Sequence, residues 1–104
     1  IEERYVDNQR YANSYTKDKF RFNHWGKYKI GMMLRNKDVE SEFIEEALNQ
    51  IDEEEYLKKL QQILKDKLRS LKYSSEYEKK GKLFKFAQSR GFESSAISKV
   101  IDSI

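Results

Sequence analysis

Few residues in this sequence could support nucleophilic or acid–base catalysis. His24 is the single histidine and cysteine is absent, so a Ser–His or Cys–His pair has one conceivable centre. His24 stands beside Trp25 in an expected interhelix loop, and no partner for proton transfer is visible near it in the sequence. Glu45 and Glu46, or the acids at 53–55, are adjacent on expected helices and therefore point in different directions. We predict that the protein has no catalytic residues and is not an enzyme.

Metal, cofactor and membrane sites have equally little support. Without cysteine there are no thiolate ligands, and no loop spaces its acids as hard cations require. The four glycines are scattered rather than gathered in a phosphate-binding loop. No apolar run approaches the ~20 residues of a membrane span, and no signal-peptide pattern is present. We predict no metal, no cofactor and no membrane contact, and a cytoplasmic location, which the absence of cysteine fits.

Basic residues gather in two parts of the chain, although the net charge is only +3. Seven Lys or Arg lie between positions 17 and 37 and eleven between 58 and 90, while acids gather at 38–46 and 52–55. These segments are either solvated helix faces or surfaces for an anionic partner. Trp25 is either packed between helices or an exposed anchor. The candidate partner-binding residues are Lys17, Lys19, Arg21, Trp25, Lys27, Lys29, Lys79, Lys80, Lys82, Lys85 and Arg90.

The elements that must position these residues are all expected to be helices. The chain lacks proline, is rich in good helix formers and shows no sustained strand alternation. Asp52 followed by three glutamates is typical of a helix N-cap, whereas 72–78 is polar and is expected to be a loop. The expected helices span 7–21, 26–36, 41–51, 53–71, 78–89 and 94–104.

The apolar pattern repeats with a constant shift of 53 positions. The shift pairs Phe43 with Ala96, Ile44 with Ile97, Ala47 with Val100, Leu48 with Ile101, Ile51 with Ile104, Ile30 with Leu83, Met33 with Phe86, Leu34 with Ala87, and Val39 with Phe92. We predict an all-α fold of two tandem three-helix repeats, residues 1–51 and 52–104, with Leu48 and Ile101 as buried equivalents. Gly91 suits a left-handed turn after the fifth helix, and its counterpart is Asp38.

Three segments of the sequence resemble the RecX family. The first is the run from Tyr5 to Ala12, with its Asp7 and its aromatic-Ala pair. The second runs from Trp25-Gly26 to the Ile44-Glu45-Glu46-Ala47-Leu48 segment. The third joins Lys82-Leu83 to Arg90-Gly91-Phe92 and Ile97. Asn8 and Asp38 depart from the family pattern, where Asp and Gly are usual.

The resemblance implies a modulator of the RecA recombinase. Such proteins lie in the helical groove of the RecA–DNA filament, and they limit recombination and the SOS response that accompanies DNA repair. Family members usually carry three repeats, so this chain resembles the second and third. It begins at Ile1 without an initiator Met, and we expect it to be a fragment. The implied partner is the RecA filament, together with single- or double-stranded DNA through sequence-independent phosphate contacts.

Two other functions remain open: a stand-alone nucleic-acid-binding helical module and a structural scaffold. Insertion of the third helix into the major groove is disfavoured, because residues 41–50 carry three glutamates and no Lys or Arg. On the fifth helix, Lys79, Lys82 and Lys85 are expected to share a side that is free for a partner, away from Leu83 and Ala87.

Overall fold

The molecule consists of helices throughout the part that the structure describes. The computed structural model describes residues 2–104, with side chains from residue 7 onward, so Tyr5 and Val6 of the first motif lie outside the described side chains. Within this range there are six helices and no strand, as predicted. They are α1 (Glu2–Arg21), α2 (Lys27–Asn36), α3 (Ser41–Asn49), α4 (Glu53–Ser70), α5 (Glu76–Ser89) and α6 (Ser94–Ile101).

Capping residues in the sequence predicted the start of α4 correctly but not the start of α5. The Asp52 side chain accepts a hydrogen bond from the Glu55 N–H at 3.0 Å, which confirms the predicted cap of α4. α5 begins at Glu76, two residues before the predicted start. Ser75 accepts from the Glu78 N–H at 3.1 Å, and the Glu78 carboxylate accepts from the Ser74 N–H at 3.1 Å. Both bonds lie at the N-terminus of α5, within residues interpreted as loop, so the helix extends into them.

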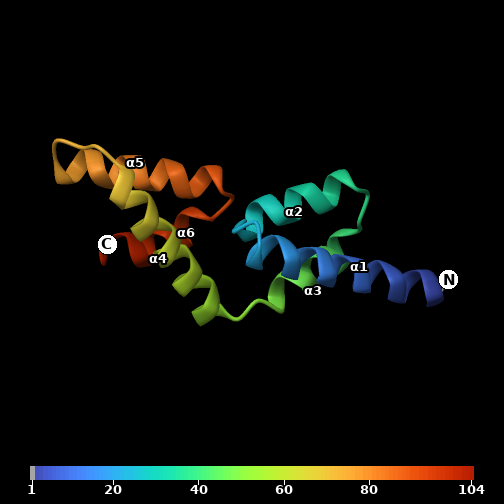
Figure 1. The fold of residues 1–104 in the computed structure, drawn as a ribbon. Coiled ribbons are helices and arrows are strands. Elements are labelled where there is room, and N and C mark those ends of the chain that lie inside the picture. Colours follow the sequence, from blue (N-terminus) through green and yellow to red (C-terminus); the bar gives the residue numbers. More distant parts are fainter. Residues whose placement is uncertain (1) are drawn as a thin grey trace.

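The helices form two three-helix units in tandem, which confirms the repeat. α1, α2 and α3 pack on one another, as do α4, α5 and α6, whereas helices of different units contact each other through side chains, as Phe20 of α1 contacts Tyr56 of α4. Figure 1 shows the units side by side along the long axis of a molecule that measures 57 × 24 × 21 Å. The C-terminal end of α5 faces the N-terminal end of α2 where the units meet (Figure 1).

Residues 53 positions apart occupy equivalent places in the two cores. Ile44 and Ile97 are both fully buried, as are several further pairs related by the same shift. Leu48 and Ile101 are also equivalent, but both are half-buried, so the prediction that they are buried is wrong. α3 and α6 have nine and eight residues, and their buried stripes include only three positions each. Leu48 and Ile101 lie at the edge of these stripes.

The turn between the second and third helices of each unit contains a left-handed residue. Gly91 has φ +91° and Asp38, its counterpart, has φ +62°. A side chain is strained in this region, and Asp38→Gly removes that strain. Glycine also raises the conformational entropy of the unfolded chain, which offsets part of the gain. We expect a net increase in the free energy of unfolding of about 0.5–1 kcal/mol. Urea denaturation tests this, with Asp38→Asn as a near-neutral control. A destabilised Asp38→Gly variant would contradict it.

Candidate partner-binding surfaces

An aromatic ladder runs along α1 and into the loop before α2. Tyr11 and Tyr15 lie one helical turn apart with ring centroids 5.9 Å apart, and the centroid of Trp25 is 6.5 Å from that of Tyr15. Tyr11 is exposed, while Tyr15 and Trp25 are half-buried against the core. Burial, and to a smaller extent Tyr11, raises the pKa of Tyr15, so its hydroxyl stays protonated. Trp25 therefore combines the two interpretations made from the sequence, because it packs on one side and is accessible on the other.

Three lysines surround this ladder. The Lys19 Nζ lies 5.4 Å from the Tyr15 centroid and 5.2 Å from that of Trp25. The Lys29 Nζ is 4.7 Å from Trp25, and the Lys37 Nζ is 5.8 Å from Tyr15. These are cation–π distances. Among the side chains that the structure describes, no carboxylate forms an ion pair with any of the three. We call Tyr11, Tyr15, Trp25, Lys19, Lys29 and Lys37 the aromatic–lysine face.

The other basic candidates of the first unit lie elsewhere. Lys17 and Arg21 line a groove between α1 and α3, and the Arg21 Nε is 4.0 Å from a Glu55 carboxylate oxygen. The Lys27 Nζ lies 4.8 Å from the ring centroid of Tyr56, at the boundary of the two units. The structure thus brings Lys19, Trp25 and Lys29 together and separates them from the other three. Lys37 was not among the candidates, although its position one residue beyond α2 could have drawn attention to it.

Three of the four lysine candidates on α5 have intramolecular partners. The Lys79 side chain is only 12% exposed, and its Nζ donates to the Ile104 carbonyl at 3.2 Å. The Lys80 Nζ donates to Asp102 at 3.0 Å, and this bond raises the pKa of Lys80. The Lys82 Nζ is 2.9 Å from Glu78. The pKa of Glu78 is lowered to about 2, first by its bond from Ser74 and then by Lys82.

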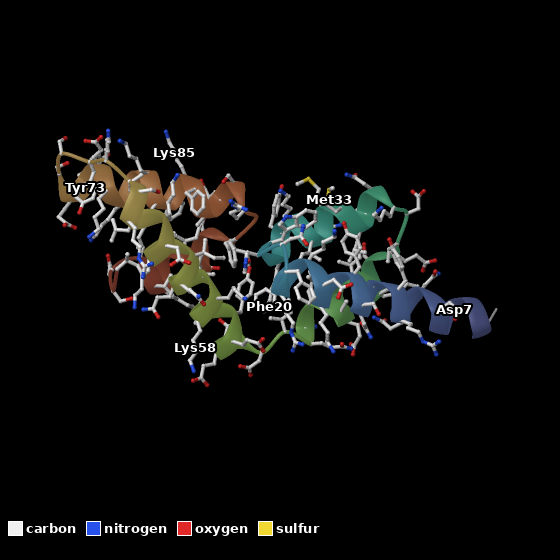
Figure 2. The ribbon with its side chains drawn as sticks, viewed as in Figure 1. Asp7, Phe20, Met33, Lys58, Tyr73 and Lys85 are labelled. Atoms are coloured by element: carbon white, nitrogen blue, oxygen red, sulfur yellow. The ribbon has the colours of Figure 1, made fainter. Side chains whose placement is uncertain are left out.

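On the side of α5 that was predicted to be free for a partner, Lys79 and Lys82 thus have intramolecular contacts, and Lys80 has one as well. Two of the acceptors, Asp102 and Ile104, lie beyond the end of α6, and the residue pattern of α5 contains no information about them. Lys85 is exposed and points outward from α5 (Figure 2). Leu83 is buried on the opposite side, as predicted. Arg90 stacks on Phe86, with its guanidinium carbon 5.2 Å from the ring centroid.

His24 lies in a groove between the units, beside Lys59, Asp66 and Arg90. Its φ is +57°. His24 is largely exposed, but partial desolvation, followed by the charges of Lys59 and Arg90, lowers its pKa and favours the neutral imidazole. The groups around it are mainly cations. We therefore expect His24→Gln to leave partner binding unchanged, as measured by titration of the folded variant. Loss of binding with an unchanged melting temperature would contradict this.

The described residues contain neither a group of metal ligands nor a membrane-spanning helix. No cluster of three or more potential metal ligands occurs there. No described helix combines the length and apolar character that a bilayer crossing requires.

Comparison with known proteins identifies both units. Residues 7–48 match the RecX second three-helix domain, and residues 53–101 match the RecX third three-helix domain. A protein named Regulatory protein RecX from Clostridium botulinum (strain Eklund 17B / Type B) is 32% identical over 99 residues, which are 93% of this chain and 46% of that relative. The chain thus spans about half the length of that protein. No solved structure gives a significant match. With two consecutive RecX domains in the expected order, this chain belongs to the RecX family of regulatory proteins.

Proposed function

We propose that this chain binds the RecA–DNA filament in the cytoplasm and restrains the recombinase, without catalysis of its own. Membership of a family of regulatory proteins supports a function by binding. The observation that carries the proposal further is the aromatic–lysine face, in which Lys19, Lys29 and Lys37 have no ion-pair partner among the described residues. A surface with three uncompensated lysines attracts an anionic partner.

The geometry of this face favours binding. Each lysine is held near an aromatic ring, so less side-chain entropy is lost when a partner is bound. The anionic groups of a RecA–DNA filament are RecA carboxylates and DNA phosphates, and ammonium groups can contact both. An elongated helical array of 57 × 24 × 21 Å has a shape suited to lying in a groove. A body lying in the filament groove would limit access to the bound DNA, and we infer inhibition on that basis.

Stand-alone binding of nucleic acid is the second candidate, and the same lysines support it. α3 occupies the position of a recognition helix, but Glu42, Glu45 and Glu46 are exposed on it and would repel phosphates. Binding would therefore depend on lysine–phosphate contacts and would not distinguish sequences.

A binding titration separates the candidates. The chain is titrated with labelled single-stranded DNA, bare or coated with RecA, and anisotropy is followed. Tighter binding to the coated DNA is expected if the filament is the partner. Equal binding to both would favour the nucleic-acid module, and no binding to either would leave only a structural scaffold. Strand exchange by RecA, measured with and without the chain, tests restraint directly.

A further inference from the structure

The two units meet around one buried side chain, that of Tyr56. Tyr56 belongs to the first turn of α4 and is 1% exposed. Its ring lies between Phe20 of α1, with centroids 5.7 Å apart, and Phe92 of the turn before α6, with centroids 5.2 Å apart. Phe20 lies in the middle of the molecule, where the units meet (Figure 2). The Tyr56 ring thus packs between buried aromatic rings of both helical units.

The Tyr56 hydroxyl joins the ends of two helices in different units. It accepts a hydrogen bond from the Lys27 N–H of α2 at 2.9 Å, and it donates one to the Glu93 carboxylate at the N-terminus of α6. Burial, and then the bond to Glu93, holds the pKa of Tyr56 far above its ordinary value. The hydroxyl therefore keeps its proton and remains the donor of the bond to Glu93.

Backbone groups complete this junction. The Gly26 N–H donates to the Arg90 carbonyl at 2.8 Å, and the Tyr28 N–H donates to the Gly91 carbonyl at 3.0 Å. Gly26 at the N-cap of α2 has no side chain to offer, so the Tyr56 hydroxyl and carbonyls of the other unit satisfy amides at this N-terminus. The approach is close: a Cβ at Gly26 would lie 2.4 Å from the Gly91 oxygen, and a Cβ at Gly91 would lie 2.2 Å from the Lys29 Cβ.

We propose that Tyr56 is a positioning residue that fixes the orientation of the two units, so that they present their basic surfaces to a partner as one rigid body. The backbones of helices from different units do not approach closely, so contacts at their ends set this orientation. These contacts are the Phe20–Tyr56 ring contact, the Tyr56 hydroxyl bonds and the glycine–glycine contact. The part of this inference that concerns the partner rests on the proposed function. Two surfaces in fixed relation bind one partner more tightly than two that move independently, because the second contact costs less entropy.

Distances between the units test the orientation without any partner. The sequence has no cysteine, so cysteines introduced at Ser14 of α1 and Ser98 of α6, both exposed, accept one spin label each. The otherwise unchanged chain should give one narrow distance distribution. Tyr56→Phe keeps the ring and removes both hydroxyl bonds, so we expect a broadened or shifted distribution from a folded protein. Tyr77→Phe, at a tyrosine that is 91% exposed, is the matched control.

Gly26→Ala provides a second, independent variant. Gly26 has φ −80°, which alanine adopts readily, so its expected effect comes only from overlap with the other unit. Gly81→Ala is its control, because no atom lies within 4 Å of a Cβ built there. Wild-type distributions for both Tyr56→Phe and Gly26→Ala would overturn the proposal.

Filament binding is measured on the same variants. We expect affinity to fall roughly tenfold or more where the distribution broadens. Broadened distances with unchanged filament binding would overturn the inference that the partner needs a fixed orientation. Failure of the wild-type chain to bind filaments would instead contradict the proposed function, while the distance result would still stand on its own.

Discussion

Replacing Ile44 or Ile97 with alanine is expected to lower the free energy of unfolding by roughly 2–5 kcal/mol. Both side chains are fully buried, in α3 and α6 respectively, and they lie 53 positions apart in equivalent places. Truncation removes the transfer free energy of the deleted methyl and methylene groups and leaves a cavity in a small three-helix core. Urea denaturation of each variant measures the loss.

The half-buried equivalents Leu48 and Ile101 provide the control for this experiment. They lie on the same two helices and lose the same number of carbon atoms on truncation to alanine, but part of each side chain already faces solvent. We expect smaller losses for these two variants than for Ile44→Ala and Ile97→Ala, in proportion to the lower burial. If truncation at the edge cost as much as truncation at the centre, the assignment of the two cores would be wrong.

The fold could be predicted because the spacing of apolar residues in each three-helix unit indicates which positions are buried. The spacing from Phe43 to Ile51 recurs from Ala96 to Ile104, and a duplicated pattern of this kind has a straightforward structural meaning. Helix boundaries were predicted where the cap was recognised, as at Asp52. They were missed at Ser75, which was interpreted as part of a polar loop.

The junction between the units could not be predicted. The apolar stripe of α4 shows that Tyr56 is buried, but not that its partners come from α1, α2 and the turn before α6. Periodicity describes one face of one helix and contains no information on which distant segment covers it. The same limit explains the lysines of α5, because the acceptors of Lys79 and Lys80 lie more than twenty residues away.

The aromatic–lysine face was predicted in part, for a related reason. Tyr11, Tyr15 and Lys19 are spaced by four residues, which places them in a row on one side of a helix. Lys29 and Lys37 join that row only because α2 packs beside α1, and this requires the tertiary structure. Of the basic residues predicted as candidates, the structure gathers Lys19 and Lys29 around Trp25 and adds Lys37 to them.

Charge reversal on this face should have the largest effect on binding. We expect the triple variant Lys19→Glu, Lys29→Glu and Lys37→Glu to bind RecA filaments roughly 10- to 100-fold more weakly at ~0.1 M salt, because three attractive contacts become repulsive. The formal net charge changes from +3 to −3, since each substitution removes two units. Filament affinity is measured by anisotropy across a range of salt concentrations. The difference from wild type should shrink as salt rises and screening shortens the range of the interaction.

A matched variant separates this surface from the effect of net charge alone. It carries the same three-lysine reversal at exposed positions of the other unit, Lys58, Lys65 and Lys72. Lys58 points away from α4 into solvent (Figure 2). We expect this control to retain most of the filament affinity, because the local arrangement of ammonium groups, rather than the total charge, meets the partner. Melting temperatures show whether both variants remain folded, since loss of the cation–π contacts costs about 0.5–1 kcal/mol each at exposed sites. Equal weakening of the two triple variants would show that Lys19, Lys29 and Lys37 act only through the overall charge, and the aromatic–lysine face would then have no specific part in binding.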